Sequence, residues 1–293
     1  YKTTFFLMTL IGVIFLIYAN GLNTPFQSDD ERHILLNLEI DNPAYYLNLV
    51  PDTGLLEKIT LRQVSLLAFA LNYQWSQENP FGYHLFNILI HICTVILVFL
   101  PVFLTIKNAT EWNEKGALMV ATTTAFLFGL HPVQTETVTY ISGRPGGMAA
   151  LFFFLSLLMF ILGGLKKPSR NTPSFAFYAL SLAMFFVAVL CKETAVTLPV
   201  ILLLYDLYFM KGENWTAFRS RAGFYILFPI VAILIYLQSH HAFAVIGGLL
   251  EKVNFSLILV QLDILKLPIK LFLFPINLSF EYDIKNQVLW GPF

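Results

Sequence analysis

Long apolar stretches separated by short polar turns follow one another along most of the chain. A helix needs about 20 mostly apolar residues to cross the hydrocarbon core of a bilayer. The pattern predicts seven such helices and a less regular eighth, at residues 3–20, 83–105, 117–131, 148–165, 175–191, 195–210, 222–238 and 256–276. Charged residues and a proline interrupt the last stretch, which either spans or lies flat on the membrane. We therefore expect an all-α, polytopic membrane protein.

The longest polar segment, residues 21–82, follows the first apolar stretch. Within it, residues 61–75 are mostly apolar but too few to span, and Tyr73 and Trp75 lie at one end. This composition is typical of a helix that lies in the membrane interface. Because apolar segments run nearly from end to end, we expect residues 1–293 to form one membrane domain with interfacial helices in the loop 21–82.

Composition agrees with a lipid environment. The chain is 57% hydrophobic and 12% charged, whereas a soluble domain carries about a quarter charged residues. The 18 basic and 18 acidic residues cancel. A chain without a basic surplus is not expected to bind nucleic acid.

The basic residues orient the predicted helices, because positively charged loops stay in the cytoplasm. With the seven regular stretches alternating from a cytoplasmic N-terminus, the inner side holds nine basic and four acidic residues, a net +5. The other side holds nine basic and fourteen acidic residues, a net −5. The short basic loop at residues 166–170 supports this orientation most strongly. The loop 21–82 is therefore expected on the periplasmic, extracellular or ER-luminal face.

Candidate chemistry begins with three consecutive acids, Asp29, Asp30 and Glu31, just beyond the first predicted span. A carboxylate beside low-dielectric lipid can serve as a general base. A solvated acidic loop would show the same spacing. The cluster by itself leaves both interpretations open.

A second group surrounds a turn that Pro132 imposes. His131 and Glu136 suit a metal-ligand pair or a proton relay. Arg144 lies in a glycine-containing turn at the start of a predicted helix, a position that suits a phosphate. An ion pair between Glu136 and Arg144 that merely closes the turn is the alternative.

Two further groups lie close to predicted helix ends. Lys192 and Glu193 separate two apolar stretches, and charges at membrane depth would cost about 2.5–3.5 kcal/mol each. The lysine therefore either binds a phosphate or forms a structural pair with Glu193. His84, Asn87 and His91 share one face of a predicted span, and such a polar stripe usually connects helices.

The charged candidates share one predicted side of the membrane. They come from three separate loops: Asp29, Asp30, Glu136, Arg144, Lys192 and Glu193. An enzyme with a lipid-linked phosphate donor needs this combination, because cations hold the phosphate leaving group and a carboxylate deprotonates the attacking hydroxyl.

Several phrases resemble one known family, the TMTC-type (transmembrane and tetratricopeptide-repeat) O-mannosyltransferases and their bacterial relatives. The resemblance begins at Phe26-Gln27-Ser28-Asp29-Asp30 with Ile34 and Asn37. It continues in order through Leu71-Asn72-Tyr73, Gly82-Tyr83-His84-Leu85-Phe86-Asn87 with His91, Phe128-Gly129-Leu130-His131-Pro132, Thr135-Glu136, Ser142-Gly143-Arg144, Lys192-Glu193-Thr194 with Leu198-Pro199, and Pro275, Leu278-Ser279 and Tyr282-Asp283.

This resemblance implies a GT-C-like bundle and a glycosyltransferase. The enzyme would transfer a sugar, usually mannose, from a polyprenyl- or dolichyl-phosphate donor to protein hydroxyl groups on the outer or luminal face. It implies that Asp29 and Asp30 are the catalytic acids, one of them the base. The positions that would line the cavity and bind the lipid phosphate are His131, Glu136, Arg144, Lys192 and Glu193. No metal site is predicted, although a divalent metal would be compatible with the chemistry.

Two departures from the family pattern favour a second hypothesis. The family often has another acidic residue where this chain has Pro145-Gly146-Gly147, and the repeats that normally follow the membrane part do not occur in this sequence. The alternative is a catalytically inactive GT-C-like subunit that acts as a scaffold among other subunits of a membrane complex. A transporter is disfavoured, because its site would lie near the midplane and not at one edge.

Overall fold

The computed structural model describes residues 2–47, 62–165, 174–210, 221, 225–230, 233, 265–276 and 278–279. All regular elements among these residues are helical, as the apolar pattern predicts. The α-helices are α1 (Lys2–Tyr18), α2 (Pro43–Tyr46), α3 (Gln63–Ser76), α4 (Pro80–Ala109), α5 (Glu114–Gly129), α6 (Thr135–Val138), α7 (Arg144–Leu165), α8 (Ser174–Cys191) and α9 (Leu198–Tyr205). Short 3-10 or π-helical segments lie at Ala19–Gly21, Glu31–Leu35, Pro132–Gln134, Ile141–Gly143, Glu193–Thr197 and Asp206–Met210.

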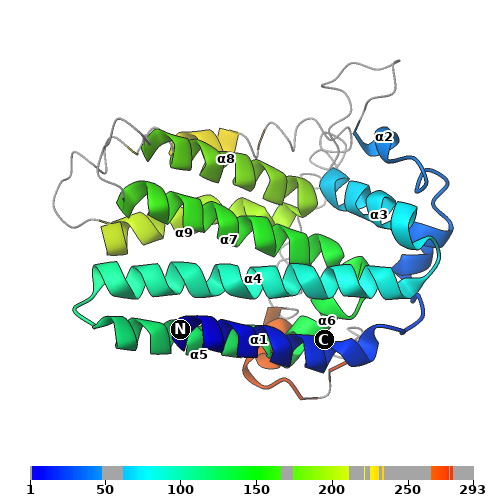
Figure 1. The fold of residues 1–293 in the computed structure, drawn as a ribbon. Helices are drawn as coiled ribbons and strands as arrows, with labels where there is room; N and C mark the ends of the chain where they lie inside the picture. The colour runs from blue at the N-terminus through cyan, green and yellow to red at the C-terminus, as the bar shows by residue number, and fades with distance from the viewer. Residues whose placement is uncertain are drawn as a thin grey trace, which may run out of the picture.

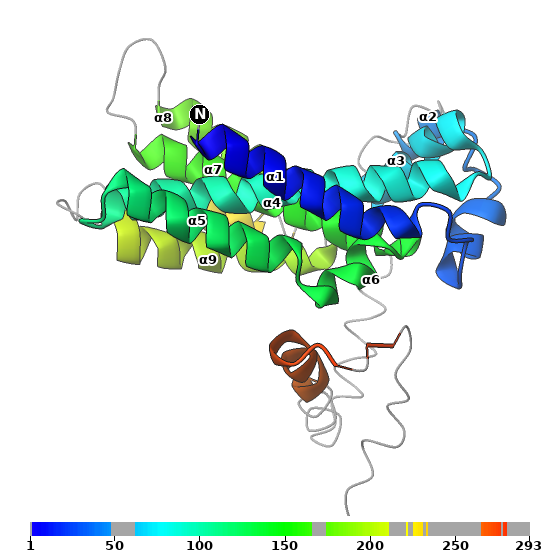
Figure 2. The ribbon, with the colours of Figure 1, turned by 60° about the horizontal axis from the view of Figure 1, so that its bottom comes forward.

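The long helices lie side by side in one bundle (Figure 1). α4 runs through its middle, with α7 and α8 on one side and α1 and α5 on the other. α4 and α7 begin at the same end, and α5 and α8 run back toward it. We call this end, where α4 and α7 begin, the site end. Figure 2 shows that α3 and α6 also lie there and that the helix at residues 265–273 lies below α6.

Local sequence signals explain where two of the long helices begin. The side-chain oxygens of Asn79 and Asn113 accept hydrogen bonds from backbone N–H groups in the first turns of α4 and α5, at 3.1 and 2.9 Å. Pro80 occupies the first turn of α4, where its missing N–H costs no hydrogen bond. The buried face of α5 repeats a small residue at every fourth position: Ala117, Ala121, Ala125 and Gly129. These small side chains let the neighbouring helices approach closely.

The two largest apolar clusters among the described residues lie on either side of α4. One joins α7, α8 and α9 and includes the fully buried Phe160, Phe185 and Leu198. The other joins α1, α4 and α5 and includes Ile14 and Val95. The two clusters hold α4 between the halves of the bundle and thereby set the positions of the side chains at its start.

The apolar helices identify a membrane protein. In the part of the chain that the structure describes, Pro80–Asn108, Ile141–Leu165 and Glu193–Met210 are long and apolar enough to cross a bilayer. A fourth span results if Glu114–Gly129 and Pro132–Val138, which meet at a 49° bend, count as one. The apolar helices at Phe5–Gly21 and Phe175–Cys191 are shorter. The expected total of seven or eight spans and the orientation stay predictions.

Two of the predicted spans lie partly outside the described residues. These are residues 222–238, of which only 225–230 and 233 are described, and residues 256–276, of which 265–276 are described. The predicted helix at 61–75 is present as α3, which packs against α4, α7 and α8 at the site end. Its position relative to a membrane interface stays a prediction.

The polar stripe on α4 connects helices, as the sequence indicates. His84 Nε2 lies 2.9 Å from the carbonyl oxygen of Thr24, and His91 Nε2 lies 3.0 Å from that of Gly129. Asn87 Oδ1 accepts a hydrogen bond from Arg144 at 2.8 Å. α4 is thereby tied to the segment after α1, to the end of α5 and to the start of α7.

Candidate functional site

The two adjacent acids after α1 face different surroundings. They follow a sharp turn at Ser28, whose φ of 50° is a left-handed conformation that residues other than glycine rarely adopt. Asp30 is buried, with 2% of its surface exposed, whereas Asp29 is exposed. The backbone N–H of Asp29 donates to the Tyr140 hydroxyl at 3.3 Å. The turn therefore holds Asp30 inside the protein and leaves Asp29 at its surface.

The Asp30 carboxylate is fixed by three donors. Its Oδ1 atom accepts from the Ser142 backbone N–H at 2.7 Å and from the Ser142 hydroxyl at 2.6 Å. Its Oδ2 atom accepts from the Gln27 backbone N–H at 3.0 Å. Each carboxylate oxygen has two lone pairs, so Oδ1 is fully used and Oδ2 keeps one lone pair. These bonds also join the first loop to the turn that precedes α7.

A cavity of about 280 Å³ lies beside Asp30, with room for about nine water molecules at ~30 Å³ each. Its polar lining includes Gln27, Asp30, His84, Glu136 and Tyr140. Its apolar lining includes Pro25, Val133, Leu271 and Leu278. Residues from four separate parts of the chain thus surround one space at the site end. Burial raises the pKa of Tyr140, which keeps its hydroxyl protonated at neutral pH.

The position of Glu136 depends on a glycine. Gly143 packs so closely against α6 that a Cβ atom there would lie 2.4 Å from the Glu136 carbonyl oxygen and 3.0 Å from the Thr137 Cα. No other residue type fits this contact without movement of the backbone. The exposed Glu136 side chain lines the cavity.

His131 lies next to the cavity and holds the later helical segment. Its Nε2 atom lies 2.9 Å from the carbonyl oxygen of Phe272, and the two rings stack with centroids 5.3 Å apart. Its Nδ1 atom accepts a hydrogen bond from the Val133 N–H at 3.2 Å. The neighbour of Phe272, Leu271, forms part of the cavity wall. His131 thereby docks residues 265–273 against the site.

Arg144 lies in the interior and does not line the cavity. It is 1% exposed, and its Nε and one terminal nitrogen donate to Asn87 Oδ1 and Asn72 Oδ1, each at 2.8 Å. Further bonds reach the backbone carbonyl oxygens of Tyr83 and Ala68, at 3.1 and 3.3 Å. The alternative of a Glu136–Arg144 ion pair is wrong, because the guanidinium donates to these neutral acceptors. Arg144 ties α3, α4 and α7 together.

Lys192 and Glu193 do not form the pair that their adjacency suggests. The Glu193 carboxylate accepts from Arg62 at 3.0 Å, in a half-exposed ion pair. The Lys192 ammonium lies over the first turn of α7, 3.6 Å from the position of a Cβ on Gly146. A Cβ on the next residue, Gly147, would lie 3.2 Å from a methyl group of Thr137 in α6. The start of α7 therefore separates Lys192 from the cavity-lining helix α6.

Comparison with known proteins gives the chain a family. Protein O-mannosyl-transferase TMTC1 of Homo sapiens is 32% identical over 220 residues, which are 70% of this chain and 24% of that protein. TMTC3 of Homo sapiens is 28% identical over 222 residues, 73% of this chain and 23% of that protein. Tmtc1 of Drosophila melanogaster is 29% identical over 193 residues.

The chain belongs to the TMTC family. It spans about a quarter of the length of the curated relatives that it matches. No family model and no solved structure matches the chain.

Sequence reasoning overlooked several residues that the fold of this TMTC-family chain places at the site. Tyr140 lines the cavity and Ser142 holds Asp30. His33 Nδ1 lies 3.1 Å from the Ser142 hydroxyl. The phrase Ser142-Gly143-Arg144, which carried part of the family resemblance, was the available signal. Ser142 holds Asp30, and Gly143 allows the Glu136 backbone to pack closely against it. Arg144 connects the helices beneath the site.

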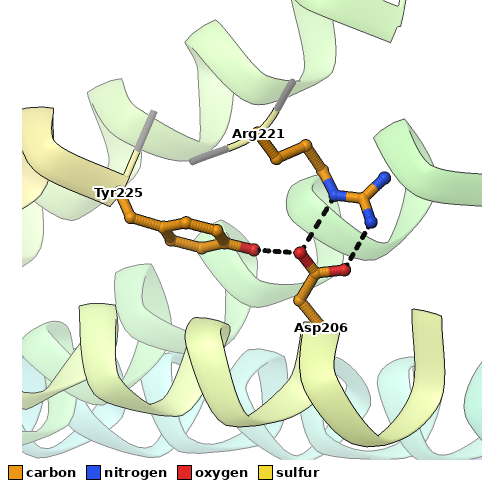
Figure 3. Close-up of polar contacts among 3 residues, drawn as sticks. All are labelled: Asp206, Arg221 and Tyr225. Atoms are coloured by element: carbon orange, nitrogen blue, oxygen red, sulfur yellow. Dashed lines mark hydrogen bonds and ion pairs between the residues drawn. The ribbon is translucent and has the colours of Figure 1, made fainter. Parts of the chain in front are cut away.

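A second polar cluster, which the sequence also left unnoticed, lies at the opposite end of the bundle. Figure 3 shows Arg221 and Tyr225 directed at the carboxylate of Asp206. Arg221 donates two hydrogen bonds, at 2.6 and 3.0 Å, and the Tyr225 hydroxyl donates one at 2.5 Å. Tyr205, which precedes Asp206, has its hydroxyl 2.7 Å from the Thr105 hydroxyl near the end of α4. Because a helix rises 1.5 Å per residue, this cluster lies about 30 Å from His84.

The arrangement at the site end suits proton abstraction beside an anionic group. A fixed carboxylate with a spare lone pair and an exposed carboxylate share one cavity. The Lys192 ammonium lies over the first turn of α7, and that turn separates it from α6. Among the described residues, no three His, Cys, Asp or Glu side chains are grouped to hold a metal ion.

Proposed function

We propose that this chain forms the membrane part of a glycosyltransferase that transfers mannose from a polyprenyl- or dolichyl-phosphate donor to protein hydroxyl groups. The observation that carries the proposal is the buried Asp30 carboxylate, which is oriented by three donors in the wall of a cavity beside apolar, membrane-type helices. The names of the relatives, protein O-mannosyl-transferases, support the choice of reaction.

In the proposed reaction, Asp30 is the general base. Both lone pairs of Oδ1 are used by Ser142, so the free lone pair of Oδ2 accepts the proton of the acceptor hydroxyl. The hydroxyl oxygen attacks the anomeric carbon of the sugar from the opposite side to the phosphate. The bond from that carbon to the phosphate oxygen breaks, and the lipid phosphate leaves with the electron pair. The configuration at the sugar is therefore inverted.

The other predicted site residues take supporting roles in this proposal. Asp29, at the surface, and Glu136, in the cavity, contact the sugar or the acceptor. Lys192 binds the lipid phosphate, and Glu193 holds Arg62 beside it. His131 positions the segment that closes one side of the cavity. Arg144 acts from beneath the site by holding the helices in place.

The proposal includes the arrangement in the membrane. Seven or eight spans form a GT-C-like bundle within one domain, the N-terminus is cytoplasmic, and the site end faces the periplasm, the extracellular space or the ER lumen. The partners are the lipid donor, a protein acceptor and further subunits of a membrane complex. This orientation follows the net charge of +5 on the predicted cytoplasmic side.

The test measures transfer of labelled mannose from polyprenyl-phosphate mannose to protein. Asp30→Asn is expected to lower kcat by about 100-fold or more, the usual contribution of a general base. Asp29→Asn and Glu136→Gln are expected to raise KM more than they lower kcat. Glu31→Gln removes an adjacent exposed acid and is the matched control.

Full activity of Asp30→Asn would remove the assignment of Asp30 as the base. A wild-type protein that binds the donor but transfers nothing would favour the scaffold subunit instead. The substitution of Pro145-Gly146-Gly147 for the acidic residue that the family often has is the observation that keeps this second function in view.

A further inference from the structure

A chain of hydrogen bonds leads from the cavity to a histidine that no part of the proposed reaction uses. Ser142 Oγ lies 2.6 Å from Asp30 Oδ1 and 3.1 Å from His33 Nδ1. The three residues belong to two segments more than 100 positions apart, because Ser142 is 112 residues beyond Asp30. Their meeting is therefore a product of the tertiary fold.

The direction of each bond follows from the number of protons. A serine hydroxyl has one proton, and an ionised carboxylate can only accept. The Ser142 proton must therefore point to Asp30, so Ser142 Oγ is the acceptor for His33. His33 must carry its proton on Nδ1, and its Nε2 atom is the one that gains or loses a proton with pH.

The ring of His33 is held in this orientation by its surroundings. It stacks on Phe69 of α3, with centroids 6.1 Å apart and 23° between the planes. Asn37 donates a hydrogen bond to the His33 carbonyl oxygen at 3.0 Å and a second to the Tyr46 hydroxyl at 2.9 Å. The stacking restricts the rotation of the ring, and the bond to the carbonyl oxygen holds the backbone that carries it.

We propose that His33 is a positioning residue that acts on Asp30 through Ser142 and makes transfer fall at acidic pH. The inference rests on the proposed function, in which Asp30 is the base. Neutral His33 supports the orientation of the carboxylate without adding charge. A proton on Nε2 would place a cation at the far end of the hydrogen-bond chain, where it stabilises the negative carboxylate and makes it a weaker base.

The charges that face His33 act in both directions. Burial lowers the pKa of His33, the negative charges of Asp29 and Asp30 raise it, and Arg62 and Arg32 lower it. The net result is a pKa below the ordinary value of the imidazole. His33 is therefore neutral at neutral pH, and the inhibitory cation forms only in more acidic solution.

The test compares pH profiles of mannose transfer from polyprenyl-phosphate mannose, between about pH 5 and 8, where imidazole titrates. In His33→Asn, the amide nitrogen occupies the position of Nδ1 and still donates, but cannot be protonated. In His33→Phe, the ring still stacks on Phe69, but the donor is lost. We expect His33→Phe to lower kcat by about tenfold, the effect of one lost hydrogen bond. His33→Asn should have a kcat close to that of the wild type at neutral pH. Its pH profile should lack the acid limb, which is the fall in activity toward acidic pH.

Ser142 provides an independent check of the chain. Ser142→Ala removes both the acceptor for His33 and one donor to Asp30, whereas Ser142→Thr keeps the hydroxyl. We expect Ser142→Ala to lower kcat and to abolish the effect of a second change at His33, and Ser142→Thr to restore both. Glu31→Gln, a neighbouring exposed acid, should keep the wild-type acid limb. Size-exclusion profiles and unfolding temperatures in detergent identify any variant that fails to fold.

The outcomes separate this inference from the proposed function. The role of His33 would be overturned if His33→Asn kept the fall in activity at acidic pH, or if folded His33→Phe kept the wild-type kcat. Asp30 would still be the base in either case, provided that Asp30→Asn is inactive. Full activity of Asp30→Asn would instead overturn the proposed function. If His33 acts only on stability, the unfolding temperature will fall and the pH profile of the folded fraction will match that of the wild type.

Discussion

Gly143→Ala offers a sharp test of how the fold positions the site, because the perturbation is one methyl group. The added Cβ atom would lie 2.4 Å from the Glu136 carbonyl oxygen, whereas an ordinary contact begins at 3.4 Å. The backbone of α6 must therefore move by about 1 Å. Ser142, which holds the base Asp30, is the neighbour of Gly143, so the movement also reaches the base. A misplacement of about 1 Å at a catalytic group can cost about 100-fold in rate. The overpacking itself should lower the free energy of unfolding by about 1–3 kcal/mol.

The assay combines mannose transfer with thermal unfolding in detergent, so that the loss of rate can be referred to folded protein. Gly12→Ala in α1 is the matched control, because a Cβ there has no atom within 4 Å. This control should gain about 0.5–1 kcal/mol from the better helix propensity of alanine. A Gly143→Ala protein with the rate and the unfolding temperature of the wild type would refute the positional argument for Glu136.

Three further predictions follow from charged groups. Asp206→Asn leaves the guanidinium of Arg221 without its buried partner and should lower the free energy of unfolding by about 3 kcal/mol in denaturant titrations. Arg62→Gln breaks an ion pair that is half exposed on both sides, so the same titration should show a loss of less than about 1 kcal/mol; an equal loss in both variants would contradict the role of burial. The pKa of His33 is lower in the folded than in the unfolded protein, so as pH falls the unfolded chain binds a proton on His33 before the folded one does. The free energy of unfolding of the wild type should therefore decrease below about pH 6.5. Unfolding temperatures across this range should show a weaker decrease in His33→Asn.

The apolar pattern was a reliable guide to the helices. The expected stretches 83–105, 148–165 and 175–191 lie within α4, α7 and α8, because burial in lipid requires a local run of apolar residues that can be read without the fold. The polar stripe of His84, Asn87 and His91 was also readable, since its spacing depends only on the helical repeat. The candidate acids and cations were found by type, and they do lie at one end of the bundle.

Side-chain partners were less accessible to sequence reasoning. Glu193 is adjacent to Lys192 in sequence, yet it pairs with Arg62, 131 residues away. Arg144 resembles a phosphate ligand in its glycine-containing turn, yet four of its hydrogen bonds go to α3 and α4. Neither partner could be identified from spacing, because helix packing brings these positions together and leaves no periodic signal.

The sequence by itself determined that this protein is helical and embedded in a membrane, since each apolar segment must satisfy its backbone hydrogen bonds within itself. Only the tertiary structure decided that Asp30 is buried while Asp29 is exposed. It also decided that Ser142 hydrogen-bonds to Asp30 and that His33 hydrogen-bonds to Ser142. The physical reason is one of range. Helix formation and partition into lipid depend on neighbours in the chain, whereas the hydrogen-bond partners of a buried side chain depend on which helices meet.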